Sequence, residues 1–268
     1  MLSSRLRGRA GEPVAIEARH GGAADALPLV LLPGTLCDSR IWLAHVAALS
    51  RQREVIVPQI GLEVSLSGEA SRLLAMLPRR FALGGFSLGA ILAFELVRQA
   101  RQRVAGLCIV SSTARADAPR NLTLRRLQLE RFEAGEVQAL MEQEMLPGYF
   151  HPGADAESRQ RWSERVLTMA RETPAAVFRN QVRYAISRPD SMSTLAAMQV
   201  PVQVQCGQND QLCPPQRQAE MVFVRSGCSL VRVPDCGHFL PIEAERSSII
   251  SMEKWLDCVC NGIPEQAA

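Results

Sequence analysis

Short, continuous apolar runs recur along the chain and determine the expected fold. Strands that are covered on both faces of a parallel sheet have such runs, whereas strands exposed on one face alternate between apolar and polar residues. Covered strands are predicted at 29–32, 81–83 and 104–110, further strands at 55–57, 200–206 and 230–233, and an antiparallel edge strand at 14–18. Segments with helical periodicity separate them. This order predicts an α/β fold with a mostly parallel, doubly wound sheet.

The helices expected between these strands have recognisable ends. Ser67 or Ser71 is expected to begin the helix that precedes the strand at 81–83. The segment 88–97 is apolar on nearly all sides, which predicts a buried helix directly after that strand. A last helix is expected at 243–258.

From residue 121 to residue 188 the sequence is charged and has the periodicity of helices. The apolar residues between 137 and 145 fall on one helical face, and Asp155 is a suitable N-cap for the helix that follows. No flexible linker flanks this stretch, which lies between two predicted strands. We therefore interpret residues 114–195 as a helical cap inserted into a core made of residues 1–113 and 196–268.

One pentapeptide lies between a predicted buried strand and a predicted buried helix. It reads Gly85-Phe86-Ser87-Leu88-Gly89 and fits the G-x-S-x-G nucleophile elbow. In such an elbow the serine occupies a strained turn, and the glycines allow strand and helix to pass without a Cβ clash. Ser87 is therefore the candidate nucleophile, at the electropositive end of a helix.

A serine nucleophile needs a base, and the base needs a carboxylate that holds it in the right tautomer. Among the four histidines, only His238 directly follows a late strand; the others are His20, His45 and His151. Asp210 follows the preceding strand, and Asp235 is closer in sequence but suits a turn better. The carboxyl ends of parallel strands share one edge of the sheet. The expected triad is therefore Ser87, Asp210 and His238.

Composition removes several other classes of function. The net charge is +3 and Lys254 is the only lysine, so there is no dense basic stripe of the kind that binds nucleic acid. The eight cysteines have neither zinc-site nor redox spacing, and no glycine-rich phosphate loop is present. We expect no metal and no cofactor. No export signal and no membrane-spanning stretch is recognisable, which predicts a cytoplasmic protein without a membrane span.

Four segments together resemble a known family. They are LLPGTLCDSRIW (31–42), GGFSLGA (84–90), CGQNDQLCPP (206–215) and VPDCGHFLPIEAER (233–246). On these segments the chain resembles the α/β-hydrolase superfamily, in its capped serine esterase-like branch, to which pimeloyl-carrier methyl ester esterases and related carboxylesterases belong. The resemblance implies Ser87 as nucleophile, Asp210 as acid and His238 as base.

The resemblance also implies an oxyanion hole made by two backbone amides. One is the amide of Leu88, which follows the nucleophile, and the other comes from the loop after the strand at 29–32. This loop commonly reads His-Gly-x, whereas here Pro33 takes the place of the histidine. Thr35 is the matching donor, and Leu36 is the alternative.

Serine at the elbow indicates hydrolysis of a carboxylic ester or thioester through an acyl-enzyme, with a small-molecule ester as substrate. Lactonases, carbon–carbon bond hydrolases and cofactor-free haloperoxidases share this triad, and ligand receptors with little turnover share the fold. Candidate pocket residues are Leu36, Tyr149, Phe150, Trp162 and Phe178, although ordinary helix packing also explains the aromatic ones.

The arginines of the predicted cap raise the question of a protein partner. Esterases that resemble this chain use a basic cap to hold an acidic acyl carrier protein, which makes such a carrier a candidate partner. Glutamates alternate with the arginines here, and this pattern favours an ordinary salt-bridged surface.

Overall fold

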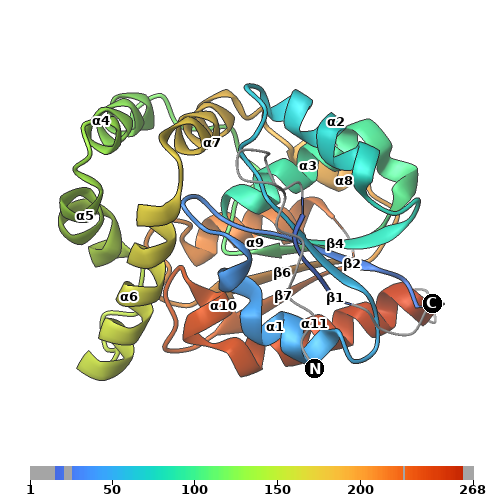
Figure 1. Cartoon of the computed structure of the whole chain (residues 1–268). Helices are drawn as coiled ribbons and strands as arrows, with labels where there is room; N and C mark the ends of the chain where they lie inside the picture. The colour runs from blue at the N-terminus through green and yellow to red at the C-terminus, as the bar shows by residue number, and fades with distance from the viewer. Residues whose placement is uncertain (1–15, 21–25, 226, 262–268) are drawn as a thin grey trace.

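A seven-stranded sheet in the order β1-β3-β2-β4-β5-β6-β7 forms the centre of the protein, in a computed structural model that describes residues 16–20, 26–225 and 227–261 (Figure 1). β1 runs antiparallel to β3, and all the other neighbouring strands are parallel. The strands are β1 (Ile16–His20), β2 (Leu29–Leu32), β3 (Val55–Pro58), β4 (Phe81–Phe86), β5 (Val104–Val110), β6 (Val202–Gly207) and β7 (Cys228–Val233). The predicted doubly wound α/β fold is confirmed. Residues 14 and 15 of the predicted edge strand lie outside the described residues.

Helices cover both faces of this sheet, which explains the continuous apolar runs. In β2, Leu29 and Leu31 belong to one buried cluster, whereas Val30 and Leu32 belong to the other. Successive side chains of a strand point to opposite faces, so both faces of β2 are packed. The first cluster includes residues of α1 (Leu43–Leu49) and α11 (Glu245–Asn261). The second includes residues of α2 (Leu66–Met76), α3 (Leu88–Ala100), α8 (Met192–Ala196) and α9 (Pro215–Val224).

Two helix ends differ from the prediction. α2 begins earlier than expected, because Ser65 and neither Ser67 nor Ser71 is its N-cap: the Ser65 side chain accepts from the amide of Gly68. The last helix is divided at Ala244 into α10 (Leu240–Glu243) and α11, and the backbone of Ala244 is not helical. Several serines stand near the start of α2, and packing decides which of them becomes the cap.

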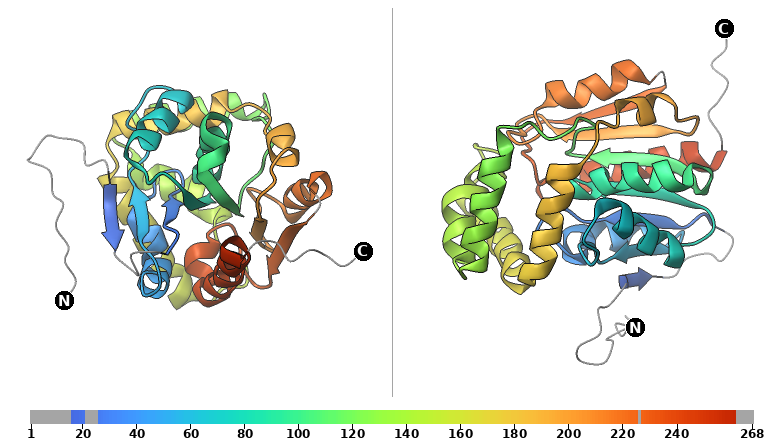
Figure 2. Two further views of the ribbon diagram at one scale, coloured as in Figure 1. Left: turned by 90° about the vertical axis from the view of Figure 1, so that its right-hand side faces the viewer. Right: turned by 90° about the horizontal axis from the view of Figure 1, so that it is seen from above.

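The helices that follow β5 form a group beside the sheet, which is clear in Figure 2. They are α4 (Asn121–Glu133), α5 (Val137–Leu140), the π-helical η3 (Met141–Met145), the short η4 (Leu146–Gly148), α6 (Ala156–Glu172) and α7 (Ala175–Ser187). We call the segment from α4 to α7 the insertion. Asp155 caps α6, as its sequence predicts. The division at residues 113/114 and 195/196 stays a prediction; α8, which crosses the second boundary, packs against α3 and α9.

The insertion is tied to loops at the carboxyl edge of the sheet. The amide of Leu36, after β2, donates to the side chain of Gln181, and the amide of His238, after β7, donates to the carbonyl of Tyr149. The insertion therefore lies over the edge at which the candidate residues gather. Within the described ranges, no helix has both the length and the apolar character that a membrane crossing requires.

Candidate active site

Ser87 stands in a strained turn between β4 and α3. Its backbone angle φ is +52°, in a region that residues other than glycine rarely adopt. The two flanking glycines are required by close backbone contacts: a Cβ on Gly85 would lie 2.5 Å from the amide nitrogen of Ala90, and one on Gly89 would lie 2.4 Å from the carbonyl oxygen of Leu32. The pentapeptide thus has the geometry of a nucleophile elbow.

His238 faces Ser87 from the loop after β7. Its Nε2 lies 3.0 Å from the hydroxyl of Ser87, and the residue is almost fully buried. The carboxylate of Glu243 holds this loop in place: it accepts from the amides of Gly237 and Phe239, each at 2.9 Å. Burial raises the pKa of Glu243, although these amide bonds oppose the shift. Sequence reasoning did not identify Glu243, the last residue of α10, although it lies within the segment 233–246 that carries the family resemblance.

Asp210 completes a hydrogen-bonded line of three side chains. Both of its carboxylate oxygens lie 3.0 Å from Nδ1 of His238. One oxygen also accepts from the backbone amides of Leu212, at 3.0 Å, and Cys213, at 2.8 Å. A carboxylate only accepts here, so Nδ1 carries the proton and the lone pair of Nε2 faces the serine hydroxyl. Asp235, the nearer acid in sequence, is exposed at 89% and adopts a positive φ in a turn.

The other histidines described by the structure lie elsewhere. His45 is fully buried; its Nε2 is 2.9 Å from the hydroxyl of Ser248, and burial lowers its pKa to about 3. His151 belongs to the insertion, and its amide donates to Glu243 at 2.7 Å. His20 ends β1 at the edge of the sheet. None of these three contacts Ser87 in the described structure.

The two expected oxyanion donors belong to the start of α3 and to the loop after β2. Leu88 is the first residue of α3, where backbone amides have no partner within the helix. The loop after β2 passes over the elbow, since a Cβ on Gly34 would lie 3.5 Å from Cβ of Ser87. In this loop the amide of Leu36 is engaged: it donates to Oε1 of Gln181 at 2.9 Å. Gln181 was not among the predicted site residues; the available signal was a polar residue on the apolar face of α7.

The predicted pocket residues separate into different environments. The ring of Tyr149 lies 6.3 Å from that of His238, and burial raises the pKa of its hydroxyl. Phe150 packs against Trp162, with ring centroids 5.6 Å apart. Phe178 packs against Phe132 within the insertion, with tilted rings whose centroids lie 4.6 Å apart. Of these aromatic residues, Tyr149 is the one that the structure brings against His238.

One group of potential metal ligands coincides with this site. Asp210, Cys213 and His238 offer ligand atoms within 4.8 Å of one another, among the residues that the structure describes. The carboxylate and the imidazole are already bonded to each other, and burial raises the pKa of the Cys213 thiol, which opposes formation of the thiolate that metals prefer. This donor set suits a catalytic triad better than a metal centre.

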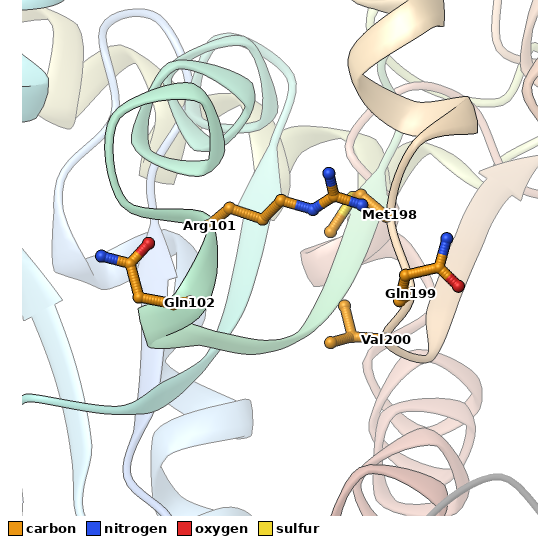
Figure 3. Close-up of a pocket in the computed structure, with 5 residues that line it drawn as sticks. All are labelled: Arg101, Gln102, Met198, Gln199 and Val200. Atoms are coloured by element: carbon orange, nitrogen blue, oxygen red, sulfur yellow. The ribbon is translucent and has the colours of Figure 1, made fainter.

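Two surface pockets lie away from Ser87, Asp210 and His238. The first, about 360 Å³, is lined by Arg101, Gln102, Met198, Gln199 and Val200, before β5 and β6 begin, and so at the opposite edge of the sheet (Figure 3). The second, about 410 Å³, lies on the insertion, where Phe150, Arg159 and Leu167 contribute to its lining. Phe150 is the one predicted pocket residue that borders it.

The sequence pattern of a large family matches this chain over most of its length. The family is described as "Alpha/beta hydrolase family", and the match extends over residues 29–247, from β2 to α11. The chain belongs to the alpha/beta hydrolase family. The match includes the elbow, Asp210 and His238 together with the strands that carry them.

Relatives of this hydrolase include esterases. A pimeloyl-[acyl-carrier protein] methyl ester esterase of Legionella pneumophila (strain Corby) is 34% identical over 96 residues, which cover 34% of this chain and 40% of that protein. The hydrolase thus matches less than half the length of this relative. The structure of a thermophilic esterase from Thermogutta terrifontis has a TM-score of 0.82 at 27% identity, covering 90% of this chain and 92% of the other.

A third neighbour shares the fold at lower identity. The enol-lactonase from Burkholderia xenovorans LB400 has a TM-score of 0.79 at 18% identity, and the alignment covers 90% of this hydrolase and 95% of the lactonase. The family and the esterase relatives indicate an enzyme of the esterase-like hydrolases. An esterase and a lactonase thus share this fold.

Proposed function

We propose that this hydrolase cleaves a carboxylic ester or thioester, with Ser87 as nucleophile, His238 as general base and Asp210 as the acid that orients it. The observation that carries the proposal is the unbroken hydrogen-bonded line from Ser87 through His238 to Asp210, with 3.0 Å at each step. The strained backbone at Ser87 supports it, because such strain is maintained where the hydroxyl must be presented.

The chemistry follows from these positions. The Ser87 hydroxyl attacks the substrate carbonyl while Nε2 of His238 takes its proton, and the amides of Leu88 and Thr35 stabilise the negative oxygen. The imidazolium then donates that proton to the departing alkoxide or thiolate, which leaves an acyl-serine. Water repeats the sequence with His238 again as base, and releases the acid. Asp210 stabilises the imidazolium in both halves.

The test combines a fluorophosphonate probe with p-nitrophenyl esters from acetyl to decanoyl, and a Ser87→Ala variant as control. Stoichiometric labelling of Ser87 together with steady turnover is the expected result, and the preferred chain length measures the acyl pocket. Labelling without turnover of any ester or lactone would instead favour a ligand receptor. Absence of labelling in a folded wild-type protein would refute the role of Ser87.

We propose a small-molecule ester as the substrate, and the carrier-bound ester of the curated relatives is the alternative. The arginines of the insertion are largely paired: Arg125 with Asp117, Arg131 with Glu136 and Glu144, and Arg179 with Glu133. Paired guanidinium groups are less available to an acidic carrier. A carrier-bound ester tested at low salt against Arg125→Ala/Arg126→Ala decides between them: unchanged turnover supports the small ester, and a large loss supports the carrier.

A further inference from the structure

The loop that holds the expected oxyanion donor contains an unusual turn. The amide of Cys37 donates to the carbonyl of Gly34 at 3.3 Å, which closes a four-residue turn with Thr35 and Leu36 at its centre. Leu36 has a φ of +54°. A positive φ at the third position is typical of a type II turn, where glycine is strongly favoured. Leucine by itself would favour the type I turn, in which the central peptide is flipped.

Both ends of that central peptide, between Thr35 and Leu36, have partners. The amide of Leu36 donates to Oε1 of Gln181 at 2.9 Å, in a buried position. On the opposite side the carbonyl of Thr35 accepts from the thiol of Cys37 at 3.3 Å. A flip of the peptide would exchange the positions of its N–H and C=O groups and break both bonds. These contacts hold the turn in the form that leucine disfavours.

Gln181 is itself held firmly. It is 2% exposed, and α7 approaches the loop after β3 so closely that a Cβ on Gly61 would lie 3.2 Å from Cγ of Gln181. One turn further along, the hydroxyl of Tyr184 donates to the carbonyl of Glu63. Oε1 of Gln181 is thus a fixed acceptor supplied by the insertion.

We propose that Gln181 is a positioning residue for the oxyanion hole: by accepting from Leu36 it holds the turn at 34–37 in its type II form and so anchors the loop that carries the amide of Thr35. The inference rests on the proposed function. In this arrangement the Leu36 amide is used by the bond to Gln181, so the amides of Thr35 and Leu88 remain as the two oxyanion donors. Catalytic geometry in this hydrolase then depends on a residue that touches neither the triad nor the substrate.

Gln181→Leu removes the acceptor and keeps the volume. We expect kcat for a p-nitrophenyl ester to fall roughly tenfold to a hundredfold, with KM changed less than threefold, because a displaced donor weakens transition-state binding. Phosphonylation of Ser87 should slow in parallel. Gln181→Glu keeps an acceptor oxygen and should retain most of kcat. Asn180→Leu is the matched control, since it removes a buried bond between the same helix and another loop, from Nδ2 of Asn180 to the carbonyl of Gly61 at 3.0 Å.

A rescue experiment separates positioning from general stability. Leu36→Gly allows the type II turn without strain, so Gln181→Leu should cost less than threefold in kcat when added to Leu36→Gly. Equal losses in the two backgrounds, or an equal loss in Asn180→Leu, would overturn the proposal. Amide hydrogen exchange of Leu36 gives a readout independent of turnover: exchange should accelerate in Gln181→Leu and stay unchanged in Asn180→Leu. This readout decides the matter even if wild-type protein hydrolyses no ester and the proposed function fails.

Discussion

Replacement of Asp210 by asparagine tests the tautomer that the site imposes on His238. One oxygen of Asp210 accepts from the amides of Leu212 and Cys213, so the carbonyl oxygen of an asparagine would take that position. Its NH₂ group would then occupy the position of the other oxygen, 3.0 Å from Nδ1 of His238. A donor would then face a donor at that position, which favours the imidazole tautomer with its proton on Nε2. The imidazole can then no longer accept the proton of Ser87.

The expected loss is large because a wrong tautomer disables the base without removing it. A fall in kcat of about four orders of magnitude is expected, equivalent to about 5 kcal/mol of transition-state stabilisation. Steady-state hydrolysis of a p-nitrophenyl ester measures it, and a thermal melt checks that the variant is folded. Asp235→Asn is the matched control: this exposed acid lies on the loop of His238, and its replacement should leave kcat unchanged. A loss below tenfold in Asp210→Asn, or a comparable loss in Asp235→Asn, would refute the reasoning.

Three further predictions concern the support of the site. Gly89→Ala should yield little folded protein or an inactive one, because its Cβ would lie 2.4 Å from the carbonyl oxygen of Leu32; expression and a thermal melt measure this, and an active, stable variant would contradict it. Burial lowers the pKa of His45 to about 3. Below pH 6.5 the unfolded chain therefore binds a proton that the folded chain does not. The free energy of unfolding then decreases as the pH is lowered, by up to about 1.4 kcal/mol per pH unit. Urea unfolding at pH 7 and pH 5 should show a smaller difference in His45→Gln than in wild type, and an equal difference would argue against neutral burial. Glu243→Gln would place an NH₂ group against backbone amides in the loop of His238. We expect kcat to fall and amide hydrogen exchange in this loop to accelerate. Glu245→Gln, at the start of α11, is the control and should change neither.

The strands and the three aligned side chains could be predicted from sequence because each depends on local information. A continuous apolar run predicts the strand before Ser87, and Asp210 and His238 each follow a later predicted strand, at 200–206 and 230–233. Their meeting at one edge then follows from parallel strands alone. The choice of Asp210 over Asp235 rested on the same argument, and the structure brings Asp210 to His238.

Contacts between distant segments could not be predicted in this way. The bond between Leu36 and Gln181 joins residues 145 positions apart, and nothing in either local sequence indicates the other. The N-cap of α2 was assigned to the wrong serine for a related reason: Ser65, Ser67 and Ser71 all suit a helix start, and packing selects among them. The aromatic residues of the insertion have several equivalent uses in a helical core, so their sequence did not show that Tyr149 alone among them would meet His238.

The position of the insertion between β5 and β6 also has a consequence for folding during synthesis. β4 and β5 emerge early and pair with each other, whereas β6, which must pair with β5, follows only after the whole insertion. Until then the edge of β5 has unpaired backbone groups, which is the kind of edge that chaperones protect and that promotes aggregation. In the proposed mechanism, Ser87 is therefore synthesised long before Asp210 and His238, so hydrolysis must wait until the last two strands join the sheet.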